Sequence, residues 1–325
     1  MTDTDTQMDG SSNYPSGEDN GRDDTMPEYE TMRERLLKEL LGNKLRLLSA
    51  IVVVLMIGTA IFAPYIAPHD EDDTFELMQE PGSYSEGDFN NDGQQERVFH
   101  ALGTNSYGND ILTRVIYGAQ ISMLVALSTI AISFTIGTAI GLYAGFRGGW
   151  VDNLLMRYID FQWAFPELVL ALGVIAFFGG LGVVNVVIAV SLAFVDDFAR
   201  LVRGEALWIR EEEYVLAAHV LGLSDRRIML REMLPNAMGP LIVQATVMIP
   251  LAIIAEAGLS FLGLGVKPTT PTWGLLIADG RGYITTHWWI SVMPGLAIMI
   301  TVLAFNLLGD GLRDALDVKD QEVSQ

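Results

Sequence analysis

Long uninterrupted apolar segments constrain this chain more than any other feature of its sequence. Apolar residues make up 50% of its 325 residues and gather into blocks of about twenty. A helix needs about 20 apolar residues to cross a bilayer, where lipid cannot satisfy exposed backbone groups. Hydropathy predicts six such spans, at residues 45–66, 120–143, 154–178, 181–199, 237–262 and 288–309. We therefore expect an all-α integral membrane protein with six transmembrane helices.

The basic residues predict how these spans are oriented. With both termini in the cytoplasm, only four of the 20 Lys and Arg residues fall outside, namely Arg97, Arg114, Lys267 and Arg281. Basic loops favour the cytoplasmic side during insertion. The sequence thus predicts a multi-pass plasma-membrane protein with cytoplasmic N and C termini, and it places a polar loop, residues 205–236, in the cytoplasm.

Composition excludes several kinds of site. The chain has no cysteine, and its four histidines form no H-E-x-x-H or similar ligand pair, so we expect no metal site. It has no G-x-x-x-x-G-K-[ST] phosphate loop, so we expect no ATP hydrolysis. No spacing suggests a Ser–His–Asp arrangement. The net charge of −20 argues against a nucleic-acid partner.

The order of polar and apolar segments predicts five regions. Residues 1–30 form a disordered acidic tail, and residues 31–66 an amphipathic surface helix followed by the first span. Residues 67–100 form an acidic extracytoplasmic segment, and its part from Asp70 to Glu96 is expected to be a solvated insertion. Residues 101–317 form a core domain with five transmembrane helices, and residues 318–325 a cytoplasmic tail.

The polar loop predicts two short helices separated by a glycine turn. Good helix formers dominate up to His219, and Gly222 tolerates the positive φ of a helix stop. Ser224 can cap a second helix. That helix is expected to end before Pro235, because the residue preceding a proline avoids the α region.

This loop resembles the "EAA" cytoplasmic loop of ABC-importer permeases, in the version of the dipeptide, oligopeptide and nickel branch. The motif's own Glu falls on Leu216, and the Ile before Leu-Pro falls on Glu232. The residues that carry the resemblance are Glu213, Tyr214, Ala217, Ala218, Gly222, Ser224, Asp225, Leu234 and Pro235. Further matches, such as Gly148-Gly149-Trp150 and Ala164-Phe165-Pro166, extend it over residues 32–317.

The resemblance implies a type I ABC-importer permease fold whose cytoplasmic loop is a coupling helix. The chain would form half of a pathway for peptides or similar small solutes, within membrane lipid. Its implied partners are a second homologous permease, two ATPase subunits holding ATP and Mg, and an extracytoplasmic solute-binding protein. No cofactor would be bound by this chain itself.

Alternatives to this interpretation remain open. The substrate could be a nickel complex or another solute. A self-sufficient secondary transporter would show an internal repeat, and none is evident. The polar loop could be a plain connector, or, with Arg226 and Arg227, a DNA-binding helix-turn-helix.

Three acidic residues lie in or near the predicted spans: Asp160, Glu167 and Glu256. Ionisable groups in lipid are costly and face a bundle interior, a partner or water. They are candidates for lining the pathway. The structural alternative is pairing between helices, for example of Asp160 with Arg157 one turn away.

Acidic residues are concentrated in two segments. Nine lie in the first thirty residues, and ten lie between Asp70 and Glu96. Such a balance resembles the acidic surfaces of halophilic archaea, where carboxylates keep a protein hydrated in concentrated salt. The alternative is two acidic segments without adaptive meaning.

Salt should therefore stabilise the protein. Like charges repel, and the Debye length falls to about 3 Å at about 1 M salt. We expect the detergent-solubilised complex to melt at a higher temperature in molar KCl than in dilute buffer, as measured by scanning fluorimetry. An equal or lower melting temperature in molar KCl would contradict this expectation.

Overall fold

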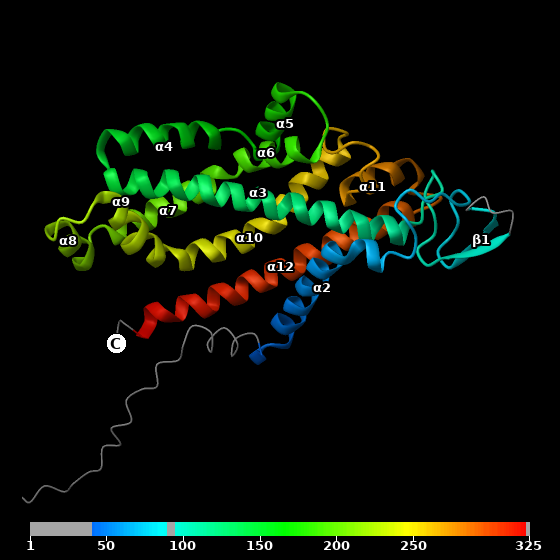
Figure 1. Cartoon of the computed structure of the whole chain (residues 1–325), viewed down its shortest axis with the longest axis horizontal. Coiled ribbons are helices and arrows are strands. Elements are labelled where there is room, and N and C mark those ends of the chain that lie inside the picture. Colours follow the sequence, from blue (N-terminus) through cyan, green and yellow to red (C-terminus); the bar gives the residue numbers. More distant parts are fainter. Residues whose placement is uncertain (1–40, 90–94, 323–325) are drawn as a thin grey trace, which may run out of the picture.

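The computed structural model describes residues 41–89 and 95–322, so the predicted acidic tail and most of the amphipathic helix lie outside it. The helix α8 (Glu213–Val220) marks one end of the molecule, the loop end. Strands β1 (Ser83–Gly87) and β2 (Glu96–His100) mark the other, the hairpin end (Figure 1). Three long helices run between these ends: α3 (Ile111–Arg147), α10 (Leu234–Phe261) and α12 (Trp289–Glu322).

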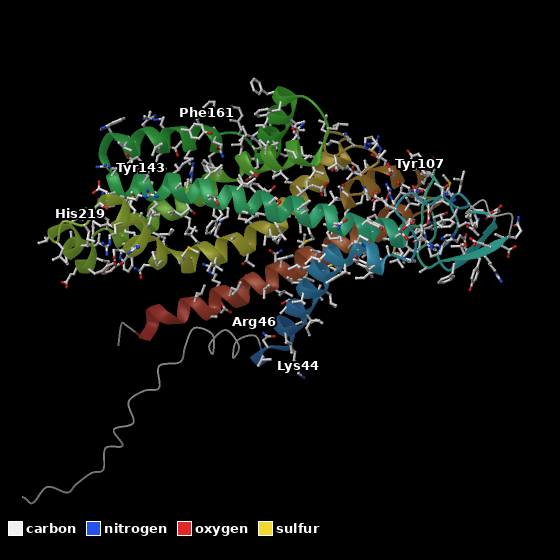
Figure 2. The ribbon with its side chains drawn as sticks, viewed as in Figure 1. Lys44, Arg46, Tyr107, Tyr143, Phe161 and His219 are labelled. Carbon is white, nitrogen blue, oxygen red and sulfur yellow. The ribbon has the colours of Figure 1, made fainter. Side chains whose placement is uncertain are left out.

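Four predicted spans are confirmed as helices. Within the described residues, the helices long and apolar enough to cross a membrane are α2 (Lys44–Ile66), Ile111–Arg147, Asp225–Phe261 and Trp289–Leu316. Helix α3 has 37 residues, about 55 Å, so it extends well beyond a hydrocarbon core of about 30 Å. An ion pair between Arg46 and Asp314 joins α2 to α12, and Figure 2 shows Arg46 near the start of α2.

The third and fourth predicted spans are each formed by two helices rather than by one straight helix. Helices α4 (Gly149–Trp163) and α5 (Glu167–Phe178) meet at 95° and make a fifth span only if the bent pair counts as one. Pro166, the N-cap of α5, marks the bend. Non-helical Phe194 separates α6 (Val183–Ala193) from α7 (Val195–Ile209). Hydropathy averages composition over a window and does not detect a change of direction.

Helices α3 and α7 pack with their backbones nearly in contact. A methyl group on Gly137 would lie 2.6 Å from Phe198 Cβ, and one on Gly145 would lie 2.7 Å from Ala206 Cβ. On Gly141, between them, it would overlap the carbonyl oxygen of Ala199. The three glycines are four residues apart and share one face of α3, the small-residue pattern by which helices associate in lipid.

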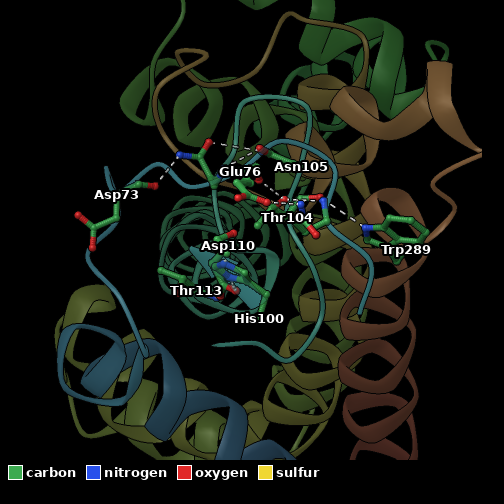
Figure 3. Close-up of polar contacts among 11 residues, drawn as sticks. Asp73, Glu76, His100, Thr104, Asn105, Asp110, Thr113 and Trp289 are labelled. Carbon is green, nitrogen blue, oxygen red and sulfur yellow. Dashed lines mark hydrogen bonds and ion pairs between the residues drawn. The ribbon is translucent and has the colours of Figure 1, made fainter. Parts of the chain in front are cut away.

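The part from Asp70 to Glu96 is not only a solvated insertion, because some of it folds against the residues that lead into the helices. Strands β1 and β2 pair antiparallel, an addition to the predicted all-α architecture. The hydroxyl of Thr104 donates to the carbonyl of Glu76 at 2.6 Å, and Trp289 of α12 donates to the carbonyl of Thr104 at 3.4 Å (Figure 3). These bonds attach the acidic segment to the start of the last helix.

The second helix of the polar loop does not end before Pro235 as predicted. A short helix, α9 (Asp225–Arg227), continues through a π-helical segment, η1 (Ile228–Met233), directly into α10. Leu234, the residue before the proline, is helical at φ −57° and ψ −45°. The N–H of Leu234 bonds to the carbonyl of Met229, five residues back, as in a π-helix. In an α-helix the ring of a proline clashes with the carbonyl four residues back, and the wider π-helical turn changes where that carbonyl lies.

The α3–α7 contact predicts a sharp stability difference between two similar substitutions. Gly141→Ala places a methyl group against the Ala199 carbonyl, and backbone cannot rotate away, so we expect a loss of about 1–3 kcal/mol or more. Gly58→Ala, in α2, meets no atom within 4 Å and should be neutral or gain up to about 1 kcal/mol. Melting temperatures of the purified chain in detergent provide the measurement. Equal melting temperatures for the two variants would mean that the helices are not held so closely.

Candidate functional site

The polar loop contains a helix stop of the kind that its glycine predicted. After α8, Gly222 has φ +75°. Its N–H bonds to the carbonyl of His219 at 3.0 Å, and the N–H of Leu223 bonds to the carbonyl of Ala218 at 3.1 Å. These two bonds form a Schellman motif, which satisfies the last carbonyls of the helix. The direction of α8 relative to α9 is thereby fixed by backbone bonds.

The outer face of α8 is apolar and exposed. Val220 is 87% exposed and Leu221 is 79% exposed, and Leu216 and Ala217 lie exposed one turn earlier. The spacing of four and five residues places these side chains on one face. Large apolar side chains at the tip of a polar loop indicate a surface that contacts another protein.

Ala218 does not belong to that face. It is 6% exposed and packs inward with Val215, which is fully buried. The resemblance pairs Ala217 with Ala218, but the structure separates them, because neighbouring residues on a helix point about 100° apart. Ala217 lies on the outer surface, and Ala218 packs within the chain. The sequence analysis did not predict that Leu216, Val220 and Leu221 form an exposed face, although their helical spacing was visible.

The remaining loop residues divide between exposed and structural positions. Glu213 and Ser224 are exposed, at the first turn of α8 and at the N-cap position of α9. Leu234 and Pro235 open α10. Burial raises the pKa of the Tyr214 phenol, and the carboxylates of Glu212 and Glu232 raise it further. The hydroxyl therefore stays protonated at neutral pH and can donate a hydrogen bond.

Several contacts attach the loop to the end of α3. Arg210 donates to the carbonyl of Gly145 at 3.1 Å, and Arg147 pairs with Asp225 at 3.1 Å. His219 stacks on Phe146 with ring centroids 5.6 Å apart, and Figure 2 shows His219 at the loop end. These contacts join the loop to the long helix that reaches the opposite end of the molecule.

Two of the acidic residues from the predicted spans lie at exposed positions. Asp160 on α4 pairs with Arg200 of α7 at 3.1 Å, with its side chain 65% exposed. The pairing suggested with Arg157 is wrong within the described part of the chain. Arg200 also lies over the ring of Trp163, 4.6 Å from its centroid. Glu167 is exposed at the first turn of α5, next to the bend.

Glu256, the third acidic residue of the predicted spans, is fully buried, unlike Asp160 and Glu167. Its two carboxylate oxygens accept hydrogen bonds from Ser122 of α3 at 2.9 Å and from Ser260 of α10 at 2.7 Å. The same Ser122 hydroxyl accepts from the backbone N–H of Trp273, at the start of α11 (Trp273–Gly280), at 3.3 Å. Glu256 therefore joins three helices, which supports the structural alternative for this residue.

Comparison with protein families gives two matches. The family described as "Binding-protein-dependent transport system inner membrane component" matches residues 137–319. The "N-terminal TM domain of oligopeptide transport permease C" matches residues 31–83. Together these matches include the polar loop, most of the helices and the first part of the acidic segment.

Curated relatives are similar over most of their length. The chain is 42% identical to the "Di/tripeptide transport system permease protein DppC" of Pseudomonas aeruginosa, covering 90% of this chain and 93% of the relative. It is 39% identical to the "Dipeptide transport system permease protein DppC" of Alkalihalophilus pseudofirmus, covering 87% and 88%. It is 42% identical to the "Glutathione transport system permease protein GsiD" of Escherichia coli, covering 83% and 85%.

The fold also resembles a solved structure. An inward-facing conformation of the MetNI methionine ABC transporter matches with a TM-score of 0.53 and 16% identity, covering 62% of this chain and 96% of that one. At this identity the match shows the fold alone, and it confirms the predicted type I architecture.

Proposed function

The chain belongs to the family of binding-protein-dependent transport system inner membrane components, and we propose that it forms half of the pathway of an ATP-driven importer of peptides. It is a multi-pass permease subunit of an ABC importer. The peptide substrate is supported by relatives named for dipeptide, di/tripeptide and glutathione transport. A nickel complex or another solute is the alternative. The relatives are named as permeases, in agreement with a transport subunit that leaves ATP hydrolysis to its partners.

We propose that the chain works in a complex with a second homologous permease, two ATPase subunits and a solute-binding protein. A single chain offers only part of a pathway, since Asp160 and Glu167 lie exposed on α4 and α5 rather than around an enclosed channel. A second permease facing these helices would enclose them. We propose Asp160 and Glu167 as the charged groups on that path, and we assign Glu256 to helix packing. ATP and Mg belong to the ATPase subunits, and this chain needs no cofactor for the proposed transport.

The observation that carries the coupling proposal is the exposed apolar face of α8. In lipid such a face would need no explanation, but α8 lies in a polar loop at the end of the molecule, beyond the long helices (Figure 1). Leu216, Ala217, Val220 and Leu221 would enter a groove on an ATPase subunit. The contacts of Arg210 and Asp225 with the end of α3 would transmit movement of that subunit to the spans.

We also propose that the protein works in concentrated salt. Most carboxylates of the acidic segment, including Asp70, Asp72, Asp73 and Glu80, are exposed. Exposed carboxylates gain most from screening by salt.

Substitution of Leu221 tests the coupling loop. Leu221→Asp buries an unpaired carboxylate in the proposed groove, which costs about 2 kcal/mol or more, roughly thirtyfold in affinity. We expect the reconstituted complex to lose ATP hydrolysis stimulated by loaded binding protein. Leu221→Met keeps an apolar side chain of similar volume and should retain it.

The side chain is 79% exposed, so neither change should alter the melting temperature of the isolated chain. Full stimulation in Leu221→Asp would mean that this face contacts no ATPase, and the coupling proposal would be lost. The family assignment would stand, because it rests on the sequence matches.

Cysteine labelling tests the orientation in a chain that has no cysteine of its own. Thr74 lies at the hairpin end and Ser224 at the loop end, and both are exposed. Ser85, in β1, is fully buried and would be a poor choice. We expect Thr74→Cys to react with an impermeant maleimide on intact cells, and Ser224→Cys to react only after detergent permeabilisation. The reverse pattern would place the polar loop outside the cell, where it could not contact an ATPase subunit, and would contradict the proposed orientation.

A further inference from the structure

Three potential metal ligands meet at the hairpin end, although they are far apart in the sequence. His69 follows the end of α2, His100 ends β2, and Asp110 caps α3. Each offers one ligand atom, and these atoms all lie within 4.8 Å of one another. Figure 3 shows His100 beside Asp110 at the start of α3. His100 is fully buried, and Asp110 is 2% exposed.

His69 supplies the observation that points to a ligand. Its Nε2 atom is buried and has no hydrogen-bond partner within the described residues. A buried polar atom without a partner is costly, and native structures avoid it unless an ion or water completes the site. The ring is held by Phe75, whose centroid lies 4.8 Å from that of His69 and 4.8 Å from that of His100. Phe75 thus covers one side of the cluster with apolar surface.

The outer contacts of His100 and Asp110 match the pattern by which metal ligands are held. His100 Nε2 lies 2.9 Å from the hydroxyl of Ser85, and Asp110 Oδ2 accepts from the N–H and the hydroxyl of Thr113 at 2.8 and 2.9 Å. This leaves His100 Nδ1 and Asp110 Oδ1 facing each other at 3.0 Å. In metal sites the second nitrogen of a ligating histidine and the second oxygen of a carboxylate are held by such partners, which fix their orientation.

We propose that His69 Nε2, His100 Nδ1 and Asp110 Oδ1 bind a divalent transition metal of the zinc class. Two imidazole nitrogens and one carboxylate oxygen suit Zn²⁺, whereas Ca²⁺ and Mg²⁺ require mainly oxygen ligands. Metal–ligand bonds of about 2.0–2.2 Å place tetrahedral ligands about 3.4 Å apart. The His100–Asp110 pair is already near that spacing.

For tetrahedral bonds His69 has to approach by up to about 1.4 Å, from a separation of at most 4.8 Å. It lies beyond the C-cap of α2, outside any helix. Coordination replaces the His100–Asp110 hydrogen bond. His100 Nδ1 then binds the ion without a proton, and the ring proton lies on Nε2, which donates to the Ser85 hydroxyl, so a neutral His100 changes tautomer and releases no net proton. Exposed carboxylates of Asp70, Asp72 and Asp73 next to His69 raise the local concentration of cations. The bound ion would fasten α2, the hairpin and α3 to one another. This role is independent of the proposed transport function.

Metal titration of the full-length chain, purified in detergent and treated with a chelator, tests the site. We expect one equivalent of Zn²⁺ to bind and to raise the melting temperature, and Co²⁺ to give the visible absorption of a tetrahedral nitrogen–oxygen site. Mg²⁺ should not compete. We expect His69→Gln to bind Zn²⁺ at least about 10–100-fold more weakly, because loss of even an outer partner of a metal ligand has an effect of that size.

Two further variants keep the result interpretable. Asp110→Asn preserves a good helix N-cap but removes the carboxylate, so it should weaken Zn²⁺ binding while the metal-free chain stays folded. His287→Gln, which changes a histidine between the short helix η2 (Arg281–Tyr283) and α12, should bind Zn²⁺ like the unsubstituted chain. The proposal is overturned if the unsubstituted chain takes up no Zn²⁺, or if His69→Gln and Asp110→Asn bind it as tightly as His287→Gln does.

Discussion

The close contact between α3 and α7 is the interaction on which the rest of the architecture depends. Helices in lipid gain little from apolar burial against each other, so close packing and backbone approach must supply the attraction. Gly137, Gly141 and Gly145 allow that approach along three turns of α3. Because α7 leads directly into the polar loop, this contact also fixes where α8 stands relative to the spans.

Polar contacts then join the loop to the long helix α3. Arg210 and the Arg147–Asp225 pair join the loop to the end of α3, and the Schellman motif around Gly222 sets the direction of α8. At the other end of α3, Asp110 caps the helix and contacts the hairpin through His100. One helix therefore connects the face proposed to meet an ATPase with the segment proposed to bind metal.

The sequence-based prediction and the structure differ where the direction of a helix matters more than its composition. The segments 154–178 and 181–199 are apolar enough to be predicted as spans, but the chain bends by 95° before α5 and breaks at Phe194. Pro235 was expected to end a helix, and a π-helical turn carries the helix past it. The GxxxG spacing of Gly137 and Gly141 was present in the sequence and would have predicted a close helix contact on this face of α3, although not that α7 is the partner.

The sequence by itself determined the class of protein, four of the spans, and the glycine stop within the polar loop. These follow from local physical rules: apolar length, φ preference and motif spacing. Only the tertiary structure decided that Ala218 packs inward while Leu221 faces out, and that Glu256 is a buried link. It alone brought His69, His100 and Asp110 together, since their distance in space depends on how the hairpin folds back onto α3 and no sequence spacing encodes it.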